Sequence, residues 1–257
     1  MSSDNDLYNI ISNIEKFINQ IIHSTKSQGV VIGLSGGIDS SITAALAVNA
    51  LGSEKVLGLI LPDSRITPLT DVNDANNIAK DLRINVKEID ISDIHKSFMK
   101  ILPDDNIAEG NLRARIRMCI LYYYANIHNK LVIGTGDKSE LLIGYFTKYG
   151  DGGVDLLPIG EIYKTDVRKI AKILNIPQQI ITKKSSPQLW KNHEAEKEIG
   201  WTYDEIDSVF KLLFEQNKSI TSISNMLNIK QTKIEELLNK YQTTLHKRQL
   251  PKTIVKD

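Results

Sequence analysis

Hydrophobic residues recur along this chain with two different periods. Between Leu7 and Ile22 they return every three or four positions, which predicts one amphipathic helix. Short runs of consecutive apolar residues follow, and they predict buried strands at 30–34, 56–61 and 131–134; a further strand is expected at 85–89. Helical periodicity returns between these runs and predicts helices at 38–51, 71–82, 91–101 and 107–129.

The alternation of strands and helices predicts one fold class. Crossovers of this length connect parallel strands, so we expect an α/β fold with a doubly wound, mostly parallel sheet flanked by helices. Ligands of such sheets bind beyond the carboxyl ends of the strands. The walls of a site are therefore expected in the loops after Leu34, Leu61, Ile89 and Gly134.

The second half of the chain follows another pattern. Residues 144–160 are rich in glycine but carry aromatic side chains, which favours an ordered functional loop. A helix is predicted at 164–174, and helical periodicity extends from 203 to 246. We expect a single domain over 1–257, with a core at about 25–181, a lid-like segment at about 182–200 and a helical C-terminal region at about 201–250.

Residues 221–234 are similar to a helix-turn-helix, which makes a nucleic-acid-binding protein one alternative. Two helices that pack under the sheet explain the same periodicity. The formal net charge is only +1 over 257 residues, so the chain as a whole does not attract nucleic acid or anionic membranes. The sequence also shows no apolar run of the length that export or membrane insertion needs. We therefore expect a cytoplasmic protein that binds neither nucleic acid nor a membrane.

Cys119 is the single cysteine, so no intrachain disulfide can form, which fits a reducing compartment. Its neighbours are apolar and helical in pattern, which predicts a buried and inert thiol. Three tyrosines follow at 122–124. On a helix they point in different directions, which favours packing in the core or at a dimer contact over base stacking.

The most informative stretch is GLSGGIDSS at 33–41, where the first strand passes into a helix. Backbone N–H groups at such a turn, together with the helix dipole, bind phosphate, and glycines allow close approach. The loop is not a Walker loop, because no lysine follows Gly37. Asp39 stands among groups aimed at phosphate, which makes sense if Mg²⁺ lies between them; capping the helix is its alternative role.

Residues 35–40 resemble the S-G-G-x-D-S loop of the ATP pyrophosphatase superfamily, whose members cut ATP between the α- and β-phosphates and hold pyrophosphate in this loop. Three later stretches narrow the resemblance: GNLRARIRM at 110–118, GTGDKSE at 134–140 and YFTKYGDGGVD at 145–155. Together with the loop they make 30–251 similar to the archaeal-type ammonia-dependent NAD⁺ synthetases.

The resemblance implies a ligase activity. That family amidates deamido-NAD⁺ (nicotinic acid adenine dinucleotide): the substrate carboxylate attacks the α-phosphate of ATP, pyrophosphate leaves, and ammonia displaces AMP from the acyl-adenylate. Alignment of charged reactants and cations accounts for such catalysis without a protein nucleophile. The chain offers Cys119 without a glutaminase motif around it, so free ammonia is the expected nitrogen donor, with a separate glutaminase partner as the alternative source.

The resemblance also assigns residues. ATP would bind through Gly33, Leu34, Ser35, Gly36, Gly37, Ile38, Asp39, Ser40, Thr135, Lys164 and Ser186. Deamido-NAD⁺ would bind through Arg115, Lys148, Asp155, His246 and Lys247. Mg²⁺ would be held by Asp39 and Glu140, and the catalytic residues would be Asp39 and Lys164. A homodimer is implied as well, with the helix at 107–129 in its interface.

Several of these residues have a purely structural alternative. Lys164 could be an exposed lysine at a helix start, and Lys148 and Asp155 could pair only with each other. Glu140 is expected in the first turn of a helix, where an acidic side chain interacts favourably with the helix dipole whether or not it binds a metal. Arg115 and His246 have solvated surface positions as their alternatives.

The sequence departs from the family in one segment. After Trp190 the family continues x-Gly-Gln-Thr-Asp-Glu, whereas this chain reads KNHEAE at 191–196, with histidine for the glutamine and alanine for the aspartate. The family's Pro-Ser-Ala is Ser-Ser-Pro at 185–187. Another ATP pyrophosphatase-family ligase, such as a tRNA-modifying enzyme, is the second enzymatic alternative, but the basic surface and extra cysteines typical of such enzymes are not evident.

Overall fold

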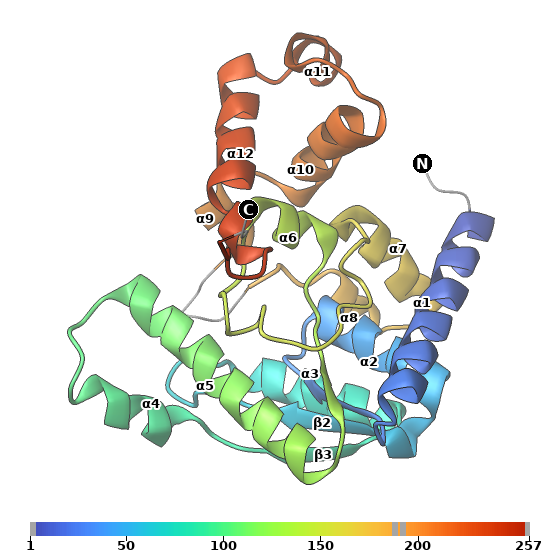
Figure 1. Cartoon of the computed structure of the whole chain (residues 1–257), viewed down its shortest axis with the longest axis vertical. Coiled ribbons are helices and arrows are strands. Elements are labelled where there is room, and N and C mark those ends of the chain that lie inside the picture. The colour runs from blue at the N-terminus through green and yellow to red at the C-terminus, as the bar shows by residue number, and fades with distance from the viewer. Residues whose placement is uncertain (1–3, 187–189, 191–193, 255–257) are drawn as a thin grey trace.

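The computed structural model describes residues 4–186, 190 and 194–254 (Figure 1). The strands are β1 Val30–Gly33, β2 Val56–Ile60, β3 Asn85–Glu88 and β4 Leu131–Ile133. The helices are α1 Asp4–Thr25, α2 Ile38–Leu51, α3 Leu69–Asp81, α4 Ser92–Met99, α5 Asn106–Ile127, α6 Lys138–Ile143, α7 Lys164–Ile173, α8 Gln178–Ile181, α9 Ala195–Ile199, α10 Tyr203–Phe210, α11 Ile220–Leu227 and α12 Gln231–Thr243. Shorter helical turns are η1 Ser53–Lys55, η2 Lys211–Glu215 and η3 Leu245–Lys247.

The four strands form one parallel sheet in the order β3-β2-β1-β4. Val31 of β1 is in register with Leu57 of β2 and with Val132 of β4. The chain therefore moves outward from β1 in one direction and returns to its other side at β4. This order confirms the predicted doubly wound α/β fold and puts the end of β1 at the point where the strand order reverses.

Helices cover both faces of the sheet. Side chains of a strand alternate between the two faces, so neighbouring residues pack against different helices. Val30 and Ile32 pack in the larger core with α1, α2, α3 and α7. Val31 and Val132 point the other way and pack against α5. Helix α2 lies inside the larger core, which explains why it is apolar all round.

The last helices form a separate hydrophobic cluster above the sheet (Figure 1). It centres on Tyr203 and Phe210 of α10, with Ile223 of α11 and Ile234 of α12 packed against them. Helices α11 and α12 are joined by a tight turn in which Asn228 is left-handed, with φ +54°. The expectation that these two helices pack under the sheet is wrong, because their apolar faces are buried against α10 and α6 instead.

Cys119 differs from the expectation too. Its side chain is exposed on α5 instead of buried, because α5 turns a different face to the sheet at this point. Where the boundaries of these elements differ from the expected ones, they shift by one to three residues, as at α4, where Ile91 is buried in the core and the helix begins at Ser92. Among the described residues, every helix is too short or too polar to cross a membrane.

Candidate active site

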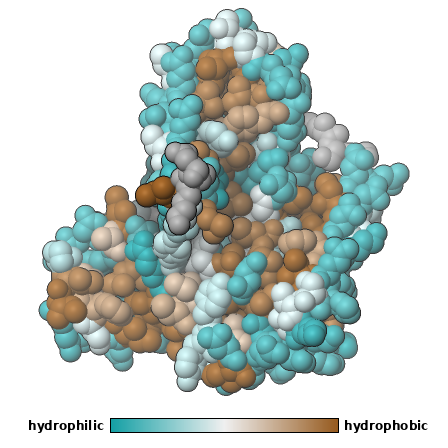
Figure 2. All heavy atoms as spheres, in the orientation of Figure 1, coloured by the Kyte–Doolittle hydropathy of each residue, from teal (hydrophilic) through white to brown (hydrophobic). Residues whose placement is uncertain are grey.

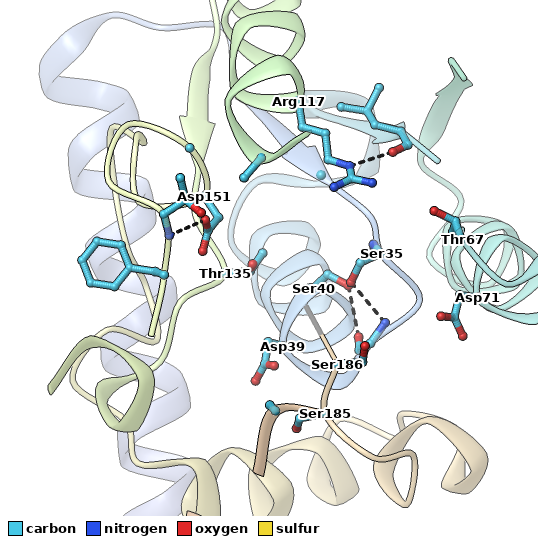
Figure 3. A pocket seen from close by; sticks show the side chains of 18 of the residues that line it. Ser35, Asp39, Ser40, Thr67, Asp71, Arg117, Thr135, Asp151, Ser185 and Ser186 are labelled. Carbon is cyan, nitrogen blue, oxygen red and sulfur yellow. Dashed lines mark hydrogen bonds between the residues drawn. The ribbon is translucent and has the colours of Figure 1, made fainter. Parts of the chain in front are cut away.

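The loop after β1 has the geometry of a phosphate-binding turn (Figure 3). The hydroxyls of Ser35 and Ser40 lie 3.1 Å apart, and the Gly37 N–H donates to Ser35 Oγ at 3.3 Å. Ser40 and Ser41 both donate to the Gly37 carbonyl, at 3.1 and 2.8 Å. Hydroxyls and backbone N–H groups therefore converge at the start of α2, whose dipole adds partial positive charge.

Gly36 fixes the shape of this loop. Its φ is +73°, which only glycine adopts without strain. A Cβ at this position would lie 2.2 Å from the carbonyl oxygen of Asp71 in α3, so the residue also has to be glycine for steric reasons. The loop is thereby packed tightly against the first turn of α3.

Three carboxylates meet beside the loop. Asp39 lies in the first turn of α2, Asp137 caps the N-terminus of α6, and Glu140 lies one turn further along α6. One oxygen of each lies within 4.8 Å of the others. Strands β1 and β4 are neighbours, so the helices that follow them begin side by side, and this adjacency brings the acids together.

Lys164, at the start of α7, enters the middle of this cluster. Its Nζ lies 2.8 Å from Asp39, 2.6 Å from Asp137 and 3.1 Å from Glu140. The side chain is fully buried, which excludes the exposed helix-start alternative. The ring of Tyr203 lies 4.9 Å from the same ammonium. Asp39 is not a helix cap either, since Gly37 occupies that position and Asp39 pairs with Lys164.

Burial and mutual repulsion shift the pKa values of this cluster. Burial raises the pKa of Glu140 and of Asp137 above their usual values, and the Lys164 ammonium offsets only part of that effect. Burial would lower the pKa of Lys164, but the surrounding carboxylates, Asp137 first, hold it well above its ordinary value. The ammonium is therefore charged, while the carboxylates are held in a crowded site that favours additional positive charge.

The donor set fits a hard divalent cation. Asp39 Oδ1 is buried and has no hydrogen-bond partner among the described residues. Three carboxyl groups surround one ammonium, and carboxylate oxygens are the ligands that Mg²⁺ prefers. Asp39, Asp137 and Glu140 would hold such an ion beside the phosphate loop.

Loop and acidic cluster open into one cavity of about 850 Å³, a volume within the range of nucleotide-sized ligands. Thr135 lines it from the end of β4, as expected from the sequence. The opposite wall is mostly apolar and includes Leu61, Met118 and Val154. Arg117 of α5 donates from Nε to the Leu61 carbonyl at 2.8 Å and lines the same wall (Figure 3).

Residues 183–186 close the cavity on the side of the phosphate loop, and Glu194 and Glu198 line it further along. Ser186 lies in this wall, where the sequence placed it; so does Ser185, whose carbonyl accepts from the Ala195 N–H at 3.0 Å. The departures from the family at 187 and 191–193 lie outside the described residues. Ala195, the alanine in place of the family's aspartate, is buried at the start of α9.

The residues assigned to deamido-NAD⁺ form a chain of contacts, with one exception. Arg115 donates to the Lys148 carbonyl at 3.3 Å, and Lys148 Nζ donates to the His246 carbonyl at 2.7 Å. Lys247 Nζ donates to two carbonyls of the glycine-rich loop and lines the cavity. Asp155 stands apart. It accepts from the Val132 N–H at 2.7 Å and from the Tyr122 hydroxyl at 3.1 Å, so it does not pair with Lys148.

Sequence reasoning missed Asp137. A polar residue before a helix is usually an N-cap, and Asp137 is one, accepting from the Glu140 N–H at 2.9 Å. Its second oxygen faces Lys164. The signal that could have found it is its place just after the fourth strand, where the fold gathers ligand-binding groups. Lys183, which donates to the Gly36 carbonyl of the phosphate loop, and its partner Asp71 of α3 were missed as well.

The parallel sheet, the phosphate loop at its switch point and the adjoining carboxylates define an α/β nucleotide-binding protein of the ATP pyrophosphatase class. The sequence pattern of the family described as NAD synthase matches residues 10–251. The chain belongs to that family.

Sequence similarity to individual members of the family supports this assignment. The chain is 47% identical to the NH₃-dependent NAD⁺ synthetase of Hyperthermus butylicus over 250 residues, which is 96% of this chain and 91% of the relative. It is 45% identical to the NH₃-dependent NAD⁺ synthetase of Archaeoglobus fulgidus over 243 residues, 94% of each chain.

Solved structures agree in fold. The NH₃-dependent NAD synthetase of Campylobacter jejuni superposes with a TM-score of 0.82 at 34% identity, covering 97% of this chain and 99% of the other. The NMN synthetase of Francisella tularensis superposes with a TM-score of 0.84 at 32% identity, covering 96% and 98%. The expected fold, with its helical C-terminal region, is therefore that of the NAD synthetases.

Proposed function

We propose that this protein is an ammonia-dependent NAD⁺ synthetase, a carbon–nitrogen ligase that converts deamido-NAD⁺, ATP and ammonia into NAD⁺, AMP and pyrophosphate. The observation that carries the proposal is the phosphate loop opening into the same cavity as the buried carboxylates, in a chain of the NAD synthase family. The names of the relatives, which match this chain over most of their length, support ammonia as the nitrogen donor.

In the first step an oxygen of the substrate carboxylate attacks the α-phosphorus of ATP. The bond to the bridging oxygen breaks, and pyrophosphate leaves with the electron pair. The N–H of Gly37 and the hydroxyls of Ser35 and Ser40 would hold that leaving group; their position in the same turn supports this role. Mg²⁺, held by Asp39, Asp137 and Glu140, would neutralise the phosphate charge.

In the second step ammonia attacks the acyl carbon of the adenylate. The carbon–oxygen bond to AMP breaks, and the proton lost from nitrogen passes to solvent. Lys164 keeps its position through three carboxylates, so its positive charge is fixed before any substrate arrives. Fixed charge of this kind needs no reorganisation in the transition state, which is the usual source of electrostatic catalysis.

We further propose that deamido-NAD⁺ binds where Arg115, Lys148, His246 and Lys247 come together at the glycine-rich loop. Two of these residues belong to the C-terminal helical region and two to the sheet side, so a bound substrate would bridge both. Asp155 is the member of the assigned set whose contacts lie elsewhere, on β4 and α5.

A homodimer is part of the proposal. Helices α4 and α5 expose large apolar side chains, which gather in brown on the lower left of Figure 2. The exposed apolar side chains of these two helices include Ile94, Phe98, Ile107 and Ile127, with exposed fractions of 41 to 64%, and Tyr123 of α5 is 66% exposed. A contiguous apolar surface of this kind is typical of a protein contact.

The test is ATP–pyrophosphate exchange with purified protein. Exchange that requires deamido-NAD⁺ supports the proposal, and exchange without it, or only with tRNA, contradicts it. Nicotinic acid mononucleotide belongs in a parallel reaction, because one structural neighbour is an NMN synthetase. Exchange only with the mononucleotide would move the substrate to that compound and leave the chemistry unchanged.

Asp39→Ala is the matched variant. It should abolish exchange while the fold persists, because Asp39 lies beside the phosphate loop and is partly exposed to the cavity. Asp204→Ala, an exposed acid on α10, is the control and should exchange like the wild type. Full exchange by Asp39→Ala would remove Asp39 from the metal site.

A further inference from the structure

Lys183 joins three parts of the active site at one atom. Its Nζ donates to the Gly36 carbonyl of the phosphate loop at 3.1 Å. The same atom pairs with Asp71 at 2.8 Å and with Asp74, both on α3. Lys183 itself follows α8 and begins the segment that lines the cavity on the side of the loop.

The grip on this ammonium is tight. The side chains of Asp71 and Asp74 are only 11 and 13% exposed. Gln179 Nε2 donates to the other oxygen of Asp74 at 3.0 Å, which holds that carboxylate in place. Partial burial would lower the pKa of Lys183, but its hydrogen bonds with Asp71 and Asp74 outweigh this and raise it, so the amine is protonated.

The contact with Gly36 sets the direction of a peptide plane. In a trans peptide the C=O of one residue and the N–H of the next point in opposite directions. The Gly36 carbonyl points out of the loop to Lys183, so the Gly37 N–H points into it, where it donates to Ser35 Oγ at 3.3 Å. Rotation of this one plane would replace an N–H donor by a carbonyl oxygen, which repels phosphate.

Within the loop, the 3.3 Å hydrogen bond from the Gly37 N–H to Ser35 Oγ opposes that rotation, but the backbone itself offers little resistance. Turning the plane changes ψ of Gly36 and φ of Gly37, and glycine at both positions removes the Cβ clashes that would otherwise oppose it. The packing of Gly36 against the Asp71 carbonyl fixes the position of the Gly36 Cα but not the direction of the following peptide. The charge-assisted hydrogen bond from Lys183 to the Gly36 carbonyl adds to the Ser35 contact and favours the same orientation.

We infer that Lys183 is a positioning residue that latches the Gly36–Gly37 peptide, so that the Gly37 N–H faces the pyrophosphate end of the nucleotide. The inference rests on the proposed function, because it deepens the role of the phosphate loop. Lys183 acts through the loop and touches no reacting atom. Lys183 also begins the segment that contains Ser185 and Ser186. Its contact with Gly36 therefore couples the position of that segment to the loop.

The experiment compares three variants of the full-length protein. Lys183→Met keeps the aliphatic stem and removes the donor, and Lys183→Arg keeps a charged donor. Lys211→Met is the matched control, because Lys211 also pairs with a carboxylate on another helix, Asp166 at 2.9 Å, away from the cavity. Calorimetric titration with magnesium pyrophosphate gives the affinity of the loop, and thermal unfolding gives the loss of stability.

For Lys183→Met we expect affinity for magnesium pyrophosphate to fall about tenfold, the size expected for one charge-assisted hydrogen bond. KM for ATP in the exchange reaction should rise by a similar factor, and Lys183→Arg should recover most of the loss. Lys211→Met should bind pyrophosphate like the wild type even where it loses as much stability. The inference would be overturned if Lys183→Met bound magnesium pyrophosphate as tightly as the wild type. It would also be overturned if Lys211→Met lost as much affinity for magnesium pyrophosphate as Lys183→Met.

A spectroscopic measurement separates positioning from stability. In protein labelled with ¹⁵N-glycine, the Gly37 amide should shift or broaden in ligand-free Lys183→Met and stay in place in Lys211→Met. An unmoved Gly37 signal overturns the inference. If the wild type binds pyrophosphate but shows no exchange with deamido-NAD⁺, the proposed function fails while the latch stands; if the wild type binds no pyrophosphate, both fail.

Discussion

The Nζ of Lys164 lies 2.6 Å from Oδ2 of Asp137, and both side chains are completely buried. Both residues lie at the beginning of a helix, where the dipole favours Asp137 and opposes Lys164. The lysine is stable there because Asp39 and Glu140 add two more carboxylates around it. Removing Lys164 leaves three buried acids without their cationic partner, which is costly.

Lys164→Met tests this balance directly. Without divalent cation, we expect the free energy of unfolding to fall by about 3–5 kcal/mol, since three carboxylates then face one another unpaired. Saturating Mg²⁺ should restore part of the loss, because the cation supplies the missing positive charge. Urea unfolding with and without Mg²⁺ measures both effects. Lys169→Met, on the exposed side of α7, is the control; a Lys164→Met protein as stable as that control would contradict the prediction.

Asp137→Asn separates capping from charge. Asparagine still caps α6 through its side-chain oxygen, so the melting temperature should change little in the presence of Mg²⁺. Loss of the negative charge should raise the Mg²⁺ concentration needed for half-maximal exchange by roughly tenfold. Binding of Mn²⁺, followed by electron paramagnetic resonance, gives the same comparison without turnover. Unchanged metal affinity would show that Asp137 only positions Lys164.

Asp63, beyond the end of β2, gives a prediction for acid stability. Burial would raise its pKa, but hydrogen bonds from Arg65 and Arg113 outweigh this and lower the pKa from 3.8 to about 2. A depressed folded-state pKa stabilises the protein above pH 4, and this contribution, about 2 kcal/mol, is lost as the pH falls towards 2.

The measurement is the free energy of unfolding as a function of pH for the wild type and Asp63→Asn. Across this acid range the wild type should lose about 2 kcal/mol more than the variant, because only the wild type takes up the extra proton. At neutral pH the variant should be the less stable of the two, since Arg113 is buried and loses a charged partner. Parallel pH curves would show that the Asp63 carboxyl is not perturbed.

Tyr123→Asp tests the apolar surface of α5. Tyr123 is 66% exposed, so the substitution should not disturb the monomer fold, but a charge in a dimer contact should dissociate it. Light scattering coupled to size exclusion measures the mass. Tyr8→Asp, at a similarly exposed tyrosine on α1, is the control and should leave the mass unchanged. A dimer that persists in Tyr123→Asp would place the interface elsewhere.

The sequence predicted the sheet well for a physical reason. Strands 30–34 and 56–61 are continuous apolar runs because both faces of a parallel sheet are buried. This pattern can be recognised in the sequence without knowing which helices cover each face. The C-terminal helices were found by the same kind of pattern, but periodicity says only that a helix has an apolar face. What covers that face was decided by tertiary packing, which placed α11 and α12 on α10 rather than under the sheet.

The site shows the same division. The amino-acid sequence by itself determined the phosphate loop, because its glycines, hydroxyls and helix start act within nine consecutive residues. Only the tertiary structure decided that Lys164 is buried 2.8 Å from Asp39, 125 positions away, that Asp137 faces it, and that Lys183 reaches Gly36 from the segment after α8. Coulomb and hydrogen-bond energies depend on distance in space, and that distance is set by how the helices pack around the sheet.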